Sequence, residues 1–250
     1  MRPLIAGNWK MHGLTAQLRD IETISATVHS RSPAADVLIC LPATLLSKAA
    51  YTAAGRIAIG GEDCHAEVSG AFTGDISADM LKDAGAAAVI VGHSERRKYH
   101  GETDAMVAAK ARAAYRSGLS TIVCIGETEA QYSAGNRLAV CGEQIAGSVP
   151  AELARSGTLA IAYEPLWAIG SGHVPTHDQI AQVHGHIRKC LMELAGTAGA
   201  EMRILYGGSV TSDNAHEILG LANVDGVLIG GASLLAADFD AVLRTLPVRA

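Results

Sequence analysis

The sequence predicts an α/β fold, a closed (β/α)8 barrel, on the basis of three observations. Short apolar runs rich in β-branched residues recur eight times along the 250 residues, segments of helical periodicity lie between them, and no linker or shift in composition divides the chain. Alternating strands and helices indicate parallel strands joined by crossover helices, and eight such units in about 250 residues are typical of a closed barrel. We therefore expect residues 1–250 to form a single (β/α)8 domain.

The predicted strands are almost continuous in apolar residues, as strands buried on both faces of a parallel sheet require. Apolar residues spaced by three and four predict amphipathic helices over 14–28, 180–194 and 235–246. Thr176 and Gln179 form a T-x-x-Q capping box at the start of the second helix. A doubly wound open sheet is the alternative that this pattern leaves open. The strands are predicted at 4–6, 37–41, 57–59, 88–91, 121–125, 159–163, 204–206 and 227–229.

Composition and charge exclude several classes of protein. Hydrophobic residues make up 49% of the chain and charged residues 18%, which supplies a large core and argues against disorder. The net charge is −5 without a long basic run, so we expect neither a nucleic-acid partner nor a membrane surface. The five cysteines contain no C-x-x-C pair, and no apolar run is long enough to span a bilayer. We therefore expect a protein of the reducing cytoplasm.

Polar residues and glycine pairs gather at or just after the carboxyl ends of the predicted strands. In a (β/α)8 barrel all these ends meet at one mouth. An amine, an imidazole and carboxylates at one mouth predict a site that binds a phosphate and moves a proton next to a carbonyl. The residues, in strand order, are Asn8, Lys10, His93, Glu95, Glu164, Gly207, Gly208, Ser209, Gly230 and Gly231.

Each of these residues also has an ordinary structural interpretation. Lys10 is compatible with a solvated lysine, His93 with a hydrogen-bonded core histidine and Glu164 with a strand-end carboxylate, while glycine pairs occur in turns. Their joint occurrence at the same end of successive units favours a functional site. The chain has no G-x-x-x-x-G-K-[ST] motif and no G-x-G-x-x-G after a strand, which favours a small metabolite phosphate over a nucleotide.

Five segments resemble the signature segments of the triosephosphate isomerase family, in order and over the whole chain. They are NWKM at 8–11, GHSERR at 92–97, YEPLWAIGSG at 163–172, YGGSV at 206–210 and IGGASL at 229–234. The resemblance implies a TIM barrel that interconverts dihydroxyacetone phosphate and D-glyceraldehyde 3-phosphate through an enediolate, in glycolysis and gluconeogenesis. It implies no metal and no organic cofactor.

The same resemblance implies the catalytic roles. Glu164 would take the proton from carbon and return it to the neighbouring carbon, and a neutral His93 would donate a hydrogen bond to the enediolate oxygens. Lys10 would place positive charge beside the phosphate and the developing oxyanion, and Asn8 would orient the site.

The resemblance further implies a phosphate site and a lid. Backbone N–H groups suit a dianion in an acidic protein. Closure of a lid at 165–176 would exclude water and protect the enediolate from losing phosphate. Ile169 and Leu228 would then form an apolar clamp that raises the basicity of Glu164. The implied phosphate donors belong to Gly170, Ser209, Gly230 and Gly231.

A homodimer is expected, because segment 65–77 resembles the loop that family members insert into a partner subunit, with Thr73 reaching the neighbouring site near Lys10. After the third strand the family commonly has Gln and Asn, whereas this chain has Glu62 and Asp63. An ionised Glu62 at an interface is costly unless it is paired. Replacing Glu62 with Gln is therefore expected to raise thermal stability without altering turnover.

The end of the lid also departs from the family pattern. Family members often have Lys, Thr and Ala where this chain has His, Val and Pro at 173–175. Proline lacks an N–H, so the closed-lid bond that family members make from this position to the tyrosine matching Tyr206 cannot form. Either Tyr206 finds another partner, or closure rests more on Ser209 and Gly172.

Two other functions compete with this interpretation. One is a paralogous isomerase of a four-carbon ketose phosphate (erythrulose phosphate) that uses the same base and imidazole, since the motifs report chemistry and phosphate rather than carbon count. The other is a non-catalytic phosphate-binding or scaffolding barrel. The presence of Lys10, His93 and Glu164 together argues against the second.

Overall fold

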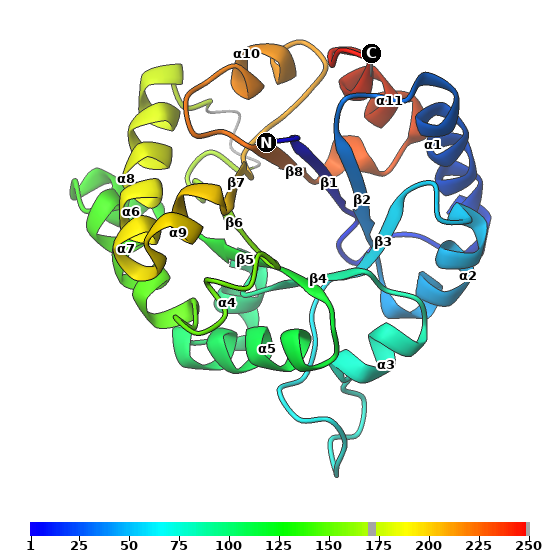
Figure 1. Cartoon of the computed structure of the whole chain (residues 1–250), viewed down its shortest axis with the longest axis horizontal. Coiled ribbons are helices and arrows are strands. Elements are labelled where there is room, and N and C mark those ends of the chain that lie inside the picture. Colours follow the sequence, from blue (N-terminus) through cyan, green and yellow to red (C-terminus); the bar gives the residue numbers. More distant parts are fainter. Residues whose placement is uncertain (170–173, 249–250) are drawn as a thin grey trace.

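Eight parallel strands close into a barrel in sequence order, β1 to β8 (Figure 1). The computed structural model describes residues 1–169 and 174–248. Strand β8 pairs in parallel with β1, Leu4 lying opposite Gly226. This closure confirms the (β/α)8 fold and excludes the open sheet. The strands are β1 (Leu4–Asn8), β2 (Asp36–Cys40), β3 (Ala58–Gly61), β4 (Ala88–Val91), β5 (Ser120–Ile125), β6 (Leu159–Tyr163), β7 (Arg203–Tyr206) and β8 (Gly226–Ile229).

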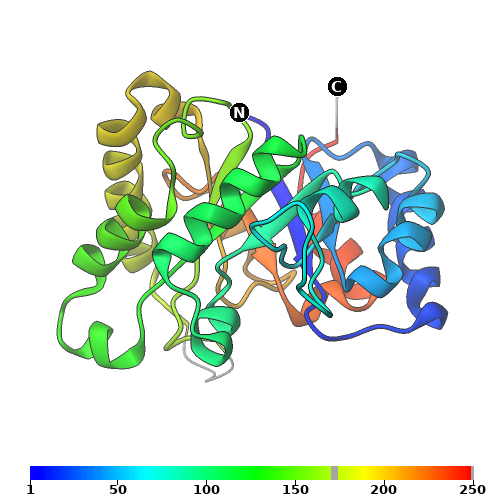
Figure 2. The same cartoon turned by 90° about the horizontal axis from the view of Figure 1, so that it is seen from below.

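Helices follow the strands and surround the barrel, as the perpendicular view also shows (Figure 2). The α-helices are α1 (Leu18–Arg31), α2 (Ala43–Ala53), α3 (Ala78–Asp83), α4 (Ser94–His100), α5 (Asp104–Arg116), α6 (Glu129–Ser133), α7 (Arg137–Ser148), α8 (His177–Ala195), α9 (Thr197–Glu201), α10 (Ala215–Leu219) and α11 (Ala236–Arg244). Two 3-10 helices are η1 (Thr15–Gln17) and η2 (Gly231–Ser233).

Successive strand residues alternate between two apolar cores, which is why the strands lack a polar face. One core fills the barrel and contains Ala6, Leu38, Cys40, Ile90, Ile122, Cys124, Ala162, Leu205 and Leu228. The other lies between the barrel and the helices and contains Ile5, Ile39, Val89, Val123, Ile161 and Val227. Cys124 is a fully buried free thiol in the interior core, so it is a small packing residue of the barrel.

Tertiary structure shifts several predicted boundaries. The expected helix from residue 14 is wrong at its start, because α1 begins at Leu18 and Leu14 is 76% exposed. Leu235 likewise precedes α11 and is exposed. The capping box is confirmed, since the Thr176 N–H donates to Gln179 Oε1 at 2.9 Å and the Gln179 N–H donates to Thr176 Oγ1 at 3.3 Å.

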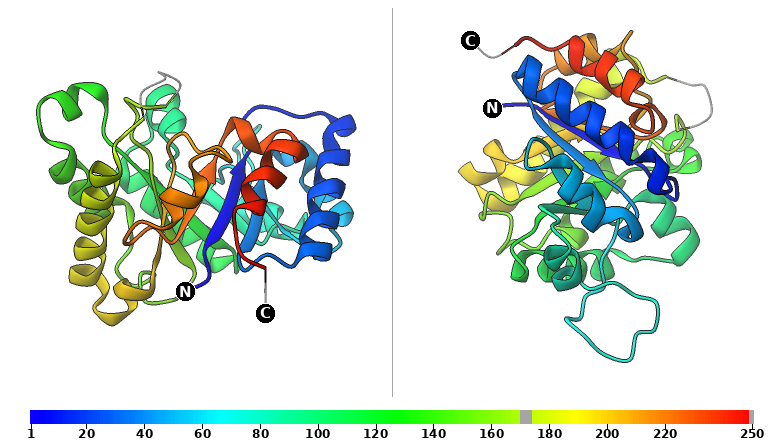
Figure 3. Two further views of the ribbon diagram at one scale, coloured as in Figure 1. Left: turned by 90° about the horizontal axis from the view of Figure 1, so that it is seen from above. Right: turned by 90° about the vertical axis from the view of Figure 1, so that its right-hand side faces the viewer.

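A loop between β3 and α3 projects beyond the ring of helices (Figures 1 and 3). Its base is closed by a bond from the His65 N–H to the Ile76 carbonyl at 2.8 Å. Residues 67–76 are all exposed, among them Val68 and Phe72. Among the described helices, none has the length and apolarity that a membrane span requires.

Candidate active site

Nine of the ten residues predicted from the strand ends line one cavity of about 260 Å³ at the carboxyl-terminal mouth of the barrel, whereas Glu95 lines a neighbouring groove. Gly170, a predicted phosphate donor, lies outside the described residues. Both residues of the expected apolar clamp also line the cavity. The lining is Asn8, Lys10, His93, Glu164, Ile169, Gly207, Gly208, Ser209, Val210, Thr211, Leu228, Ile229, Gly230, Gly231 and Ala232.

The Glu164 carboxylate is buried directly after β6, with 2% of the residue exposed. Its Oε1 lies 2.8 Å from Nε2 of His93, and its Oε2 accepts the backbone N–H of Ser94 at 2.9 Å. These bonds offset the loss of hydration that burial imposes on a carboxylate. Gly126 allows the close approach of the two chain segments, because a Cβ there would lie 1.8 Å from the Glu164 carbonyl oxygen.

His93 precedes α4 as its N-cap and is 6% exposed. Its Nδ1 accepts the backbone N–H of Glu95 at 3.3 Å, so in the neutral ring the proton resides on Nε2, which faces Glu164. Burial lowers the pKa of His93, but the charge of Glu164 and the hydrogen bond to it outweigh burial and raise that pKa. The position of Glu164 therefore controls the charge of the imidazole.

Lys10 enters the site in a strained backbone conformation, with a φ of 59°. The Oδ1 of Asn8 accepts the Lys10 backbone N–H at 3.0 Å and supports this conformation. The ammonium donates to Glu95 Oε1 at 2.7 Å. A Cβ on Gly230 would lie 3.5 Å from Cε of Lys10, so the lysine chain passes beside the glycine turn after β8.

The glycine turn after β8 is stabilised by hydrogen bonds from Ser233. Ser233 donates to the Gly230 carbonyl from its backbone N–H at 2.8 Å and from its hydroxyl at 2.7 Å. In the part of the chain that the structure describes, no acceptor bonds the N–H of Gly231 or of Ser209. Both N–H groups are therefore open to an anion in the cavity.

Sequence reasoning missed two contributors to this mouth. The N–H of Ser94 that donates to Glu164 is a backbone group, so the type of residue at position 94 does not predict this hydrogen bond. The second is Glu127, whose position just after β5 is the same signal that identified the other site residues. It is fully buried, and its Oε1 accepts the Tyr163 hydroxyl at 3.0 Å and the Trp167 indole N–H at 2.7 Å.

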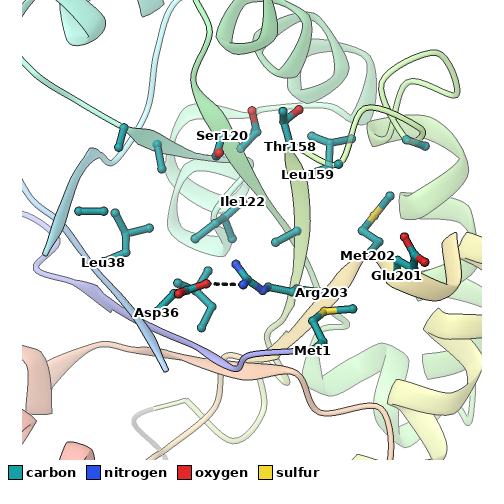
Figure 4. A pocket seen from close by; sticks show the side chains of 18 of the residues that line it. Met1, Asp36, Leu38, Ser120, Ile122, Thr158, Leu159, Glu201, Met202 and Arg203 are labelled. Atoms are coloured by element: carbon teal, nitrogen blue, oxygen red, sulfur yellow. Dashed lines mark hydrogen bonds and ion pairs between the residues drawn. The ribbon is translucent and has the colours of Figure 1, made fainter. Parts of the chain in front are cut away.

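A larger cavity, of about 510 Å³, opens at the opposite mouth of the barrel, where the strands begin (Figure 4). An ion pair between Asp36 on β2 and Arg203 on β7 spans it, and Leu38 and Ile122 are among the other residues that line it. None of the predicted site residues and no histidine is among the described residues that line it. The groups suited to proton transfer near neutral pH therefore lie at the carboxyl-terminal mouth.

The buried carboxylate, the imidazole and the lysine at the carboxyl-terminal mouth of a closed (β/α)8 barrel define a barrel enzyme built for general acid–base chemistry. Comparison with known proteins agrees: a sequence model of the triosephosphate isomerase family matches residues 3–246. The chain belongs to the triosephosphate isomerase family, whose members are aldose–ketose isomerases and thus intramolecular oxidoreductases.

Individual relatives match over almost the whole chain. The chain is 56% identical to triosephosphate isomerase of Afipia carboxidovorans over 248 residues, covering 99% of this chain and 98% of the relative. It is 58% identical to that of Ruegeria pomeroyi over 248 residues, covering 98% and 97%. A crystal structure of triosephosphate isomerase from Bartonella henselae matches with a TM-score of 0.91 at 45% identity, covering 98% of this chain and 99% of that one.

The Tyr206 hydroxyl is buried and has no hydrogen-bond partner among the described residues. Burial raises the pKa of this phenol. The hydroxyl lies against Gly208, where a Cβ would be 2.2 Å from Oη. Pro175, which has no N–H to donate, is also buried. Pro175 therefore offers no N–H to Tyr206, and the contacts that support lid closure in its place stay a prediction.

We expect Tyr206→Phe to be mild in this chain, with kcat/KM reduced less than about threefold, because the hydroxyl has no bond to lose. Steady-state kinetics beside the same substitution in a relative with alanine in place of Pro175 provide the measurement. The matched control is Tyr163→Phe, which removes a bond to Glu127 and is expected to cost about 1–2 kcal/mol of stability. An equally large loss of turnover in both Tyr206 backgrounds would defeat this expectation.

Proposed function

We propose that this chain interconverts dihydroxyacetone phosphate and D-glyceraldehyde 3-phosphate as a single-domain cytoplasmic enzyme of glycolysis and gluconeogenesis. The observation that carries the proposal is the 2.8 Å contact between Glu164 Oε1 and His93 Nε2 over a cavity that Lys10 also lines. The four-carbon alternative is not favoured, because the relatives at 51–58% identity carry the triose name.

Glu164 acts as the base. It leaves the Ser94 N–H and His93 and takes a proton from the carbon next to the carbonyl of dihydroxyacetone phosphate, while the C–H electron pair forms the enediolate double bond. The proton, now on Glu164, returns to the neighbouring carbon. The hydroxyl proton of the first carbon passes by way of His93 to the oxygen of that neighbouring carbon, so that the first carbon becomes the aldehyde. Ile169 and Leu228, which line the same cavity, keep water from the carboxylate during the reaction.

His93 and Lys10 stabilise the charge that develops on oxygen. Once Glu164 moves to the substrate, the contact that raises the pKa of His93 is lost, and burial then favours the neutral ring. Its Nε2–H donates to the enediolate oxygens. The Lys10 ammonium has three N–H donors and donates one to Glu95, so the other two remain for the substrate.

The phosphate is held by backbone N–H groups rather than by a cluster of cations. Ser209 and Gly231 line the cavity, and their N–H groups have no acceptor within the described chain. Gly230 and Gly170 complete the proposed set. The reaction as proposed needs no metal and no organic cofactor. The lid over 165–176 excludes water and keeps the enediolate from expelling phosphate.

The base is tested by Glu164→Asp, which withdraws the carboxylate by one methylene. A displacement of about 1 Å costs roughly 10²-fold in rate, so kcat should fall about that much with little change in KM. Tritium from solvent should enter the carbon-bound position of the substrate in the parent and far more slowly in the variant. Glu143→Asp, at an exposed site on α7, is the matched control. Failure of the parent to incorporate tritium would refute the mechanism.

Substrate preference is tested by kcat/KM for D-glyceraldehyde 3-phosphate against erythrulose phosphates. We expect the triose to be preferred by at least about 10²-fold, because the cavity of about 260 Å³ must also exclude water around the reacting carbons. A preference for the tetrose would replace the proposed substrate while leaving the base and the imidazole in place.

We further propose a homodimer in which the projecting loop with Thr73 enters a groove on the partner. A groove of about 750 Å³ is lined by Lys10, Glu62 and Tyr99 among others, and it shares Lys10 and His93 with the catalytic cavity. Exposed apolar side chains surround it, including Met11 at 95% and Tyr99 at 69%. Such a cluster on a protein surface is typical of an interface.

Glu62 lies on the wall of that groove, and its Oε1 is buried without a partner among the described residues. Burial and the nearby Glu95 raise the pKa of Glu62 to about 8, although a Lys10 backbone bond and the Lys10 charge oppose the shift. A carboxyl whose pKa is raised by folding costs stability as pH rises, since the unfolded chain ionises near its ordinary pKa and the folded chain does not.

Glu62→Gln is therefore expected to raise Tm by about 5 °C at pH 8 without changing kcat. The gain should grow between about pH 4.5 and pH 8 and vanish near pH 4.5, where Glu62 is protonated in both states. Calorimetry over this pH range measures it. Glu102→Gln serves as the contrast: burial raises the pKa of Glu102, but its bonds to Lys110 and Arg96 outweigh burial and lower that pKa, so its replacement should destabilise the protein. A lower Tm for Glu62→Gln at neutral pH would contradict the expectation.

A further inference from the structure

The side chain of Tyr132, on α6, contacts residues at both ends of the proposed lid. Its ring stacks on the indole of Trp167, with centroids 4.1 Å apart and planes inclined by 23°. Its hydroxyl accepts the Nε2–H of Gln179 at 2.9 Å. Trp167 lies in the first turn after Pro165, and Gln179 lies in the first turn of α8, so one side chain joins the two ends.

The contact with Gln179 reaches the residue at which the lid segment ends. Oε1 of Gln179 accepts the N–H of Thr176 at 2.9 Å, while Nε2 of the same amide donates to Tyr132. One amide therefore ties the first residue before α8 to α6. Loss of the Tyr132 hydroxyl would leave the amide free to rotate away from Thr176.

Tyr132 is itself held in place by α6 and α7. The capping box of Thr128 and Gln131 starts α6, and the guanidinium of Arg137 lies 5.9 Å from the centroid of the Tyr132 ring. Arg137 in turn donates to Gln182 on α8. The tyrosine is thus a fixed point between α6 and α8 rather than a freely rotating surface ring.

The indole of Trp167 is oriented from its other side by Glu127, which accepts its N–H at 2.7 Å. Glu127 and Tyr132 both belong to the segment that follows β5. The stack on Tyr132 and the hydrogen bond to Glu127 together fix the orientation of the indole. They therefore also fix the direction in which the backbone continues from Trp167 into the lid segment.

We propose that Tyr132 is a positioning residue that fixes the separation and direction of the two lid ends, and thereby the fit of the closed lid over the reaction. This inference rests on the proposed function of the barrel. Anchored ends reduce the number of conformations that the intervening segment must lose when it closes. A lid with loose ends would close less completely, and the enediolate would expel phosphate more often.

The test compares Tyr132→Ala, which removes both contacts, with Tyr132→Phe, which keeps the stack and removes the hydroxyl. Each is made in a Trp9→Phe background, so that fluorescence reports Trp167 alone. The matched control is Tyr51→Ala, a tyrosine on α2 that is 89% exposed. We measure kcat, KM, inorganic phosphate released per isomerisation, and Trp167 emission with and without substrate.

For Tyr132→Ala we expect kcat/KM to fall about tenfold and phosphate release per turnover to rise by a similar factor, as the loss of one stacked pair and one hydrogen bond implies. Tyr132→Phe should show about a twofold to threefold effect of the same kind. The change in Trp167 emission on adding substrate should shrink in the alanine variant. Tyr51→Ala should match the background on every readout.

Two results separate failure of this inference from failure of the proposed function. If the Trp9→Phe background and the parent both lack isomerase activity, the proposed function fails. If they are active and Tyr132→Ala shows the same phosphate release per turnover and the same emission change, Tyr132 does not position the lid. A uniform loss of activity with unchanged phosphate release and emission change also overturns the inference, since it reports damage to folding.

Discussion

The mouth of the barrel is organised by the need to bury a carboxylate and still satisfy it. Taking Glu164 to 2% exposure removes nearly all its water, which costs several kcal/mol unless hydrogen bonds replace it. The replacements come from outside its own strand, through the first N–H of α4 and the ring of His93. They reach the carboxylate only because Gly126 lets β6 run close to the end of β5. The strand order, the start of α4 and Gly126 thus all contribute to the hydrogen bonding of the Glu164 carboxylate.

Much of the fold follows from periodicity because the strands are buried on both faces. Runs such as Ala88–Val91 and Leu159–Tyr163 match the structure at both ends. Where a strand begins earlier than predicted, its first residue belongs to the strand because of a contact with a residue far away in the sequence. Asp36 and Arg203 begin their strands and pair with each other across the amino-terminal mouth, which no local pattern shows. The spacing of apolar residues predicts Leu14 in the core, but Leu14 precedes α1 and its side chain is exposed.

The site was more predictable than its supports, and the reason is physical. Lys10, His93 and Glu164 have the side chains that the proposed chemistry needs and follow strands, so the barrel mouth gathers them once the fold is known. The groups that hold them are backbone N–H groups, such as that of Ser94, or partners fixed by tertiary packing, such as Tyr132 for Trp167. The family resemblance supplied the proposed roles, whereas the chain's own Pro175 indicates only that Tyr206 receives no hydrogen bond from that position.

The proposed phosphate site requires an acidic chain to create positive potential locally. The net charge of −5 gives no long-range attraction. At the mouth, Lys10 pairs with Glu95 through one of its three donors, and its chain passes beside the turn at Gly230. The backbone N–H of Gly231 adds partial positive charge without any side chain to order. On the proposed function, phosphate binding therefore depends on the shape of the β8 turn and on the backbone conformation of Lys10 rather than on the charge elsewhere on the surface.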